Sequence, residues 1–144
     1  LWIFADNVED RMGHGRFLAF YLLTGLAAGL THWFTNPDST VPAVGASGAI
    51  ASVLGAYFVL FPRSGVIVFV PVLLVPVFFE LPAVFYLLLW FLTQLASLAP
   101  GDVGGIAWWA HIGGFLAGVL LYRFFVQPTR KWEDDEFGLE AAWD

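Results

Sequence analysis

The sequence contains no cysteine and unusually few charged residues. Its 144 residues include six Lys or Arg and twelve Asp or Glu, so charged side chains make up 12% of the chain. Soluble domains carry roughly 25%. The lack of cysteine excludes disulfides and thiolate metal sites. The lack of charge, together with 59% hydrophobic residues and a mean hydropathy of +0.76, excludes an ordinary soluble domain and predicts a membrane protein.

Positive charge is especially scarce. The basic residues form no patch and the chain has no phosphate-binding loop, so no nucleic-acid or nucleotide partner is expected. His14 and His32 lack further ligands at metal-binding spacing, so no metal site is expected. Acidic residues gather near the C-terminus. We therefore predict a transmembrane domain over residues 1–126 and an acidic, disordered cytoplasmic tail over 127–144.

Long apolar segments account for most of the chain. Four of them are candidates to span a bilayer, at residues 17–34, 48–61, 81–98 and 108–126. The chain opens with LWIF and no initiator Met, which is typical of the last turn of a further spanning helix whose earlier part is missing. The predicted fold is an all-α polytopic membrane protein, a helical bundle with the remnant of one span and four further spans.

One apolar segment lacks the pattern of a spanning helix. VIVFVPVLLVPVFF, at residues 66–79, contains Pro71 and Pro76, and this pair disfavours a straight helix. We predict a re-entrant or interfacial stretch that begins like a β-strand and returns to the side it left. Glu80 and Pro82 match the first turn of the next helix, where an acidic group and a proline are both favoured.

The cations indicate an orientation. With this topology Arg11, Arg63 and the cations after residue 122 lie on one side of the membrane, whereas segments 35–46 and 99–107 contain no Lys or Arg. Because positive charge is retained on the cytoplasmic side, the two uncharged segments are predicted to lie outside. If residues 66–79 crossed the membrane, the cations after residue 122 would lie outside. The distribution of the cations therefore favours a stretch that returns to the side it left.

Ser47 lies at the start of a short apolar helix. From Ser47 to Phe61 this helix is roughly 22 Å long, whereas the bilayer core is about 30 Å thick. Since Arg63 holds its other end at the cytoplasmic surface, Ser47 is predicted to lie below the outer surface. Gly45 and Ala46 precede it, and such compact residues let the backbone approach a ligand.

Small residues recur at four-residue spacing on two helices, which is how membrane helices achieve close packing. Two sets follow this spacing: Gly48, Ser52 and Ala56, and Ala110, Gly114 and Gly118. If the two sets face each other, Ser47 and His111 lie at matching depths near the outer ends of their helices.

A serine beside a histidine has a chemical use. Neutral imidazole can take the proton of a serine hydroxyl, and the amide of Ser47 with the positive helix end can stabilise an oxyanion. Asp102 lies in a loop, so a Ser/His dyad is favoured over a triad. On these grounds alone, a packing serine and an interfacial histidine beside two tryptophans explain the pattern equally well. Both interpretations stay open.

The motifs resemble those of one family. GASG at 45–48 followed by AHIGG at 110–114 closely resembles the rhomboid family of intramembrane serine proteases. Four further segments are similar to bacterial members of that family: VEDRMG at 8–13, ELPA at 80–83, WFLTQ at 90–94 and GGIAWW at 104–109. The resemblance covers residues 1–126 and implies a rhomboid-like bundle in a bacterial inner membrane.

The resemblance also implies an activity. It makes Ser47 the nucleophile and His111 the general base and then acid, in an acyl-enzyme route that cleaves transmembrane segments of protein substrates within the lipid bilayer. The Ser47 amide would contribute to the oxyanion hole, and Gly45 and Ala46 would line the approach to it. The resemblance implies no cofactor. The helix at 81–98 is expected to move when substrate enters.

The chain departs from the family pattern in two ways. The His and Asn of the family's second helix that support the oxyanion would lie upstream of Leu1, and Ala51 stands where some members have an aromatic that stacks on the histidine. A non-catalytic rhomboid-like binder of transmembrane segments is therefore the alternative, and a transporter or structural membrane protein is a weaker third.

We expect Thr93 and Gln94 to act as contacts between helices, and residues 6–11 to form a solvated turn with local ion pairs.

Overall fold

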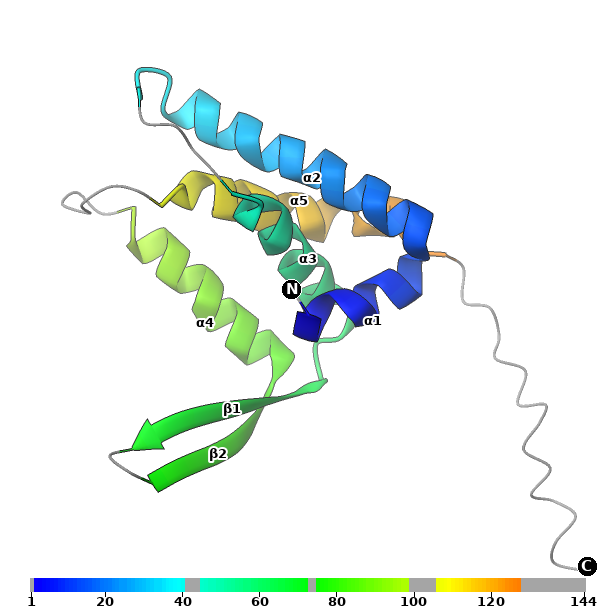
Figure 1. Ribbon diagram of the computed structural model, residues 1–144, viewed down its shortest axis with the longest axis vertical. Coiled ribbons are helices and arrows are strands. Elements are labelled where there is room, and N and C mark those ends of the chain that lie inside the picture. The colour runs from blue at the N-terminus through cyan, green and yellow to red at the C-terminus, as the bar shows by residue number, and fades with distance from the viewer. Residues whose placement is uncertain (1, 41–44, 73–74, 99–105, 128–144) are drawn as a thin grey trace, which may run out of the picture.

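The computed structural model describes residues 2–40, 45–72, 75–98 and 106–127 (Figure 1). The predicted tail over 127–144 lies outside the described residues except for Gln127. The elements in chain order are α1 (Trp2–Met12), α2 (His14–Thr35), α3 (Ser47–Leu60), β1 (Gly65–Val72), β2 (Val75–Pro82), α4 (Ala83–Ala96) and α5 (Trp108–Phe125).

Three helices form the centre of the bundle. α3 and α5 share the largest interface between helices, and α2 packs against both of them. α1 packs on α3 and α2 on one side, and α4 packs on α5 and α3 on another. Figure 1 shows the end of α2, the start of α5 and the end of α4 at one end of the bundle, with the α1–α2 turn and the end of α5 at the other.

The lengths of the helices differ widely. Within the described residues, α2 is the one helix that is both long and apolar enough to cross a membrane by itself. α3 and α4 are apolar but have 14 residues each. The outer face of α2 exposes Leu18, Leu22 and Leu26, which is the pattern of a helix whose polypeptide neighbours cover only one side.

The prediction of a solvated turn at residues 6–11 was wrong. α1 continues as a helix through these residues to Met12. Phe4, Val8 and Met12 recur at four-residue spacing and are buried in the core, so they lie on one face of the helix while the polar residues occupy the other. The ion pair that the structure describes here joins Glu9 to His14 at 2.5 Å, in an exposed position.

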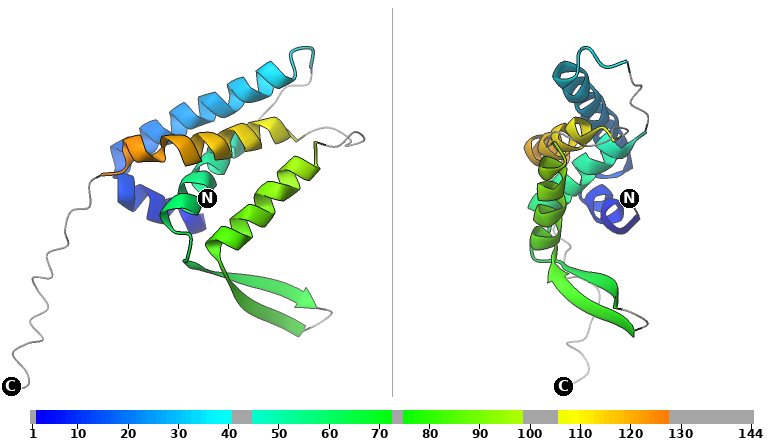
Figure 2. Two further views of the ribbon diagram at one scale, coloured as in Figure 1. Left: turned by 180° about the vertical axis from the view of Figure 1, so that it is seen from behind. Right: turned by 90° about the vertical axis from the view of Figure 1, so that its left-hand side faces the viewer.

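The stretch after α3 is a β-hairpin, so the all-α description was incomplete. β1 and β2 pair antiparallel, with Gly65 opposite Pro82 and Phe69 opposite Phe78. The Ala83 N–H donates to the Ser64 carbonyl at 2.8 Å, which closes the base of the hairpin. The stretch thus returns to the place where it left the bundle, and its return to the same side of a membrane stays a prediction. Figure 2 shows the hairpin projecting from the bundle next to α4.

The helix predicted from residue 81 begins later. Glu80 and Leu81 belong to β2, and Pro82 has extended backbone angles, with φ −55° and ψ 136°. The physical reason is the Leu81-Pro82 bond, because a residue before proline is held away from the helical region. α4 therefore starts at Ala83, whose side chain is fully buried.

Glycines let α3 and α5 touch along their backbones. A Cβ atom added at Gly114 would overlap the carbonyl oxygen of Gly48, and one added at Gly118 would overlap the carbonyl oxygen of Ser52. Gly48 in turn leaves room for Ala28 of α2, whose Cβ would lie 2.7 Å from an added Cβ. Only residues without side chains permit this approach, which fixes the relative height of the two helices.

Candidate active site

Ser47 is the first residue of α3, and the chain turns sharply to reach it. Gly45 has φ +127°, a value that side chains rarely tolerate, and Ala46 caps the helix with φ −80° and ψ 8°. The Ile50 N–H makes the bond to the Ala46 carbonyl, at 3.0 Å. The N–H groups of Ser47, Gly48 and Ala49 come before this bond and therefore have no partner within the helix. Ser47 itself is exposed.

His111 lies one turn into α5 and faces this hydroxyl. Its Nε2 is 2.9 Å from the Ser47 Oγ, within hydrogen-bonding distance. The two residues are 64 positions apart in the sequence. Their approach follows from the backbone contact described above, because Gly48 and Ala110, the immediate neighbours of Ser47 and His111, pack against each other.

Gln94 of α4 completes the surroundings of the imidazole. Its Oε1 lies 2.8 Å from His111 Nδ1, and the side chain is 5% exposed. Its Nε2 donates to the Trp90 carbonyl at 3.1 Å and to the Thr93 hydroxyl at 2.9 Å. Because a carbonyl only accepts, the amide nitrogen must face Trp90, and the amide oxygen must face the histidine.

The sequence pattern did not indicate this contact as part of the site, because a glutamine in an apolar segment predicts only a contact between helices. The partner it bonds across helices is the histidine itself. The available signal was a glutamine within an apolar segment, where polar side chains are costly unless they are paired. The sequence does not show which partner is chosen, because helical spacing alone does not determine how α4 is rotated against α5.

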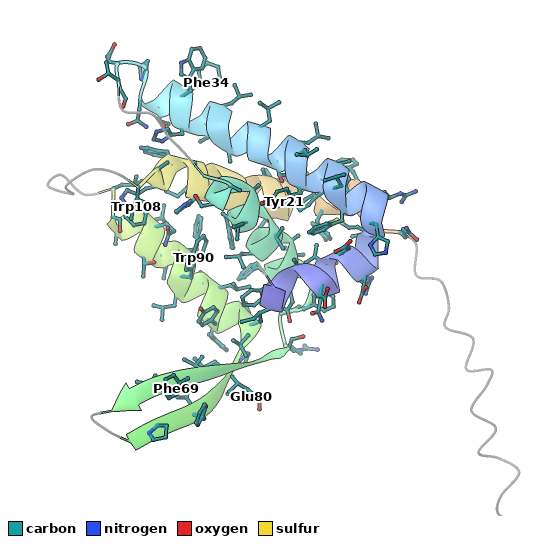
Figure 3. All side chains as sticks on the ribbon, in the orientation of Figure 1. Tyr21, Phe34, Phe69, Glu80, Trp90 and Trp108 are labelled. Carbon is teal, nitrogen blue, oxygen red and sulfur yellow. The ribbon has the colours of Figure 1, made fainter. Side chains whose placement is uncertain are left out.

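Two tryptophan rings flank the imidazole. The Trp90 ring lies 6.2 Å from the His111 ring at an interplanar angle of 35°, and the Trp108 ring lies 5.9 Å away at 87°. Figure 3 shows Trp90 on the side of α4 that faces α3 and Trp108 near the start of α5. Ala51 stands where some members of the resembled family have an aromatic residue that stacks on the histidine. It is buried, and its methyl group is too small for such a stacking contact. Aromatic contact with the histidine thus comes from α4 and α5.

The other predicted residues of the small-residue sets lie deeper. The Ser52 hydroxyl is buried one turn below Ser47 and lies 2.6 Å from the hydroxyl of Thr24. Ala56 belongs to the hydrophobic core. Gly114 and Gly118 contact α3 through its backbone, as described above. The contacts described for these residues are with neighbouring helices.

The remaining candidates do not reach the site. His32 lies beside Asn36, with 3.5 Å between its Nδ1 and the amide nitrogen, near the end of α2. His14 pairs with Glu9 at the opposite end of that helix. Asp102, the carboxylate weighed for a triad, lies outside the described residues. In the part of the chain that is described, no three His, Asp or Glu side chains group as metal ligands would.

Comparison with known proteins places this geometry in context. Residues 1–128 match the family model described as the Rhomboid domain. The chain is 27% identical over 150 residues to Rhomboid protein 1, mitochondrial, of Saccharomyces cerevisiae, an alignment that covers 99% of this chain. It spans 40% of the length of that relative. No solved structure matches the chain significantly.

The family match extends over both GASG and AHIGG and over every described element. Rhomboid proteins are integral membrane proteins, and the family acts on membrane protein substrates in the bilayer. On this match the chain belongs to the rhomboid family.

Proposed function

We propose that the protein is an intramembrane serine endopeptidase that cleaves transmembrane segments with Ser47 and His111. The observation that carries the proposal is the 2.9 Å separation of Ser47 Oγ and His111 Nε2. A serine hydroxyl is a weak nucleophile until a neighbouring base takes its proton. Members of the rhomboid family are usually serine proteases of this kind, which supports the same assignment.

The reaction follows from the positions of these atoms. His111 Nε2 accepts the proton of Ser47 Oγ as the oxygen attacks the scissile carbonyl carbon, and then gives that proton to the leaving amine. The resulting acyl-enzyme is an ester on Ser47. A water molecule, deprotonated by the same nitrogen, attacks this ester. The bond between the acyl carbon and Ser47 Oγ then breaks, His111 returns the proton to Oγ, and the cleaved segment leaves with a new C-terminal carboxyl group.

The first turn of α3 can stabilise the negative charge that develops on the oxygen of the tetrahedral intermediate. The oxygen of the tetrahedral intermediate would lie next to the Ser47 N–H, which has no partner within the helix. The helix dipole adds positive potential at the same place. Removing one donor from such a hole typically costs about 10²–10³ in rate. Gly45 and Ala46 line the approach. The positive φ of Gly45 favours glycine at this position, and glycine has no side chain that could block the approach.

The length of α3 supports a site below the membrane surface. Its 14 residues extend roughly 21 Å at about 1.5 Å per residue, less than the bilayer core of about 30 Å. We propose that the site opens to the side opposite Arg11 and Arg63, and that the C-terminus is cytoplasmic. A bacterial type and a bacterial inner membrane remain predictions, since the relative found is mitochondrial by its name.

The proposal is tested with purified protein in detergent and a fluorescent substrate that contains a transmembrane segment. Ser47→Ala and His111→Ala are each expected to lower cleavage by at least about 10³-fold, and a fluorophosphonate is expected to label Ser47 in the wild type. Ser39→Ala is the matched control, since this serine lies in the loop after α2. Cleavage by Ser47→Ala at the wild-type rate would refute the proposal.

A non-catalytic rhomboid that binds transmembrane segments is the second candidate. The family match is compatible with it, because membership of the rhomboid family suggests either a protease or a pseudoprotease. The two candidates separate in the same assay. Binding of the substrate segment with neither cleavage nor labelling of Ser47 would support the binder.

A further inference from the structure

We infer that Gln94 is a positioning residue of the reaction, which holds His111 in the tautomer that carries its proton on Nδ1. The inference rests on the proposed function, because it concerns the same serine and histidine. It is carried by the hydrogen bond between Gln94 Oε1 and His111 Nδ1 and by the two bonds that orient the glutamine amide.

The direction of each bond follows from the chemistry of the donors. The Trp90 carbonyl accepts only, so the Gln94 nitrogen faces it and the Gln94 oxygen faces the imidazole. An amide oxygen also accepts only, so His111 Nδ1 must carry a proton to make the 2.8 Å bond. Neutral imidazole has one proton, and Nε2 is therefore left with its lone pair.

That lone pair faces the nucleophile. With Nδ1 protonated, His111 Nε2 accepts the hydroxyl proton of Ser47 across 2.9 Å. In the other tautomer Nε2 carries the proton and cannot act as a base toward Ser47. Gln94 thus has the orienting role that a buried carboxylate has in a Ser-His-Asp triad, but it does so as a neutral group.

The surroundings make this contact selective. Gln94 is buried, so leaving its amide unpaired would be costly, and among the described residues its hydrogen-bond partner on another helix is His111. The Trp90 ring lies against the same imidazole, one turn earlier on α4. α4 therefore supplies both the hydrogen bond and an aromatic contact to a histidine on α5.

The first test reads the tautomer directly. The chain has three histidines, so 15N-labelled histidine in the detergent-solubilised protein gives few signals, and His111→Ala identifies the one of interest. We expect the Nδ1–H form of His111 in the wild type and a mixture of tautomers in Gln94→Met. A predominantly Nε2–H imidazole in the wild type would overturn the inference. This result does not depend on activity, so it stands apart from failure of the proposed function.

The second test measures kcat, KM and the pH profile of variants at Gln94. Gln94→Met keeps the length of the side chain and removes the acceptor, and it is expected to lower kcat about 10- to 100-fold with little change in KM, a part of the roughly 10²–10⁴ that general acid–base catalysis supplies. Gln94→Glu restores an acceptor. Because a carboxylate stabilises the imidazolium, this variant is expected to recover part of kcat and to move the acidic limb of the pH profile to higher pH.

Leu87→Ala is the control for a purely structural effect. Leu87 is fully buried on α4 and belongs to the core rather than to the site. We expect it to lower the thermal unfolding temperature while kcat and the pH profile of the folded enzyme are kept. Equal kcat and pH profiles for the wild type and Gln94→Met would overturn the inference, as would a loss of kcat in Leu87→Ala as large as that in Gln94→Met.

Discussion

Gly114→Ala tests whether the contact between α3 and α5 sets the geometry of the site. A methyl group at this position would overlap the carbonyl oxygen of Gly48. The obstructing atom belongs to the backbone of a helix, so no side chain can rotate to make room. Gly114 is one turn beyond His111, and Gly48 directly follows Ser47. The helices must therefore separate at the level where the two site residues meet.

The expected magnitude follows from the overlap. Relieving it needs a separation on the order of 1 Å, which lengthens the bond between Ser47 and His111 from 2.9 Å beyond the limit of a hydrogen bond. A misplacement of this size costs about 10²-fold in rate. The overpacking itself is expected to lower the free energy of unfolding by about 1–3 kcal/mol.

The assay is kcat for a transmembrane substrate in detergent, measured with the free energy of unfolding of the same preparation. Gly29→Ala is the matched control, because a Cβ at Gly29 of α2 meets nothing within 4 Å. We expect it to keep kcat and to change stability by less than about 1 kcal/mol. If Gly114→Ala kept both the wild-type kcat and the wild-type stability, the close contact of α3 and α5 would be refuted.

Two further predictions concern stability and are measured by denaturant unfolding in detergent micelles. Thr24→Val removes the buried hydrogen bond to the Ser52 hydroxyl at 2.6 Å and is expected to cost about 1 kcal/mol; equal stability of the two proteins would contradict this. Gly13→Ala is expected to cost about 1–3 kcal/mol, because Gly13 has φ +78° and an added Cβ would lie 2.5 Å from the Gln127 Nε2. Gly15→Ala, with nothing within 4 Å of its added Cβ, is expected to be near neutral, and a similar loss there would count against the reasoning.

The sequence predicted the helices of the bundle centre closely. The segment expected at 17–34 is α2, His14–Thr35, and the segment expected at 48–61 is α3, Ser47–Leu60. The reason is that apolar length and breakers such as Pro62 act locally. The small-residue spacing also indicated which faces of α3 and α5 approach each other, because small residues at every fourth position leave one stripe of each helix with little or no side chain.

The form of two elements depends on tertiary contacts that the sequence pattern does not show. The apolar run at 66–79 has the composition of a lipid-contacting segment, but its form as a hairpin depends on the register between β1 and β2. α1 continues beyond its apolar first residues because the side chains of Val8 and Met12 are buried in the hydrophobic core. Neither outcome follows from propensity, since charged residues at 9–11 are also typical of a turn.

The sequence by itself determined that this is a membrane protein, and it indicated a serine and a histidine at the ends of two helices with facing small residues. These properties depend on composition and on helical period, which are local. Only the tertiary structure decided that Ser47 and His111 meet at 2.9 Å and that Gln94 reaches the far side of the imidazole. The rotation of α4 against α5 selects that partner, and this rotation is set by packing across the whole bundle.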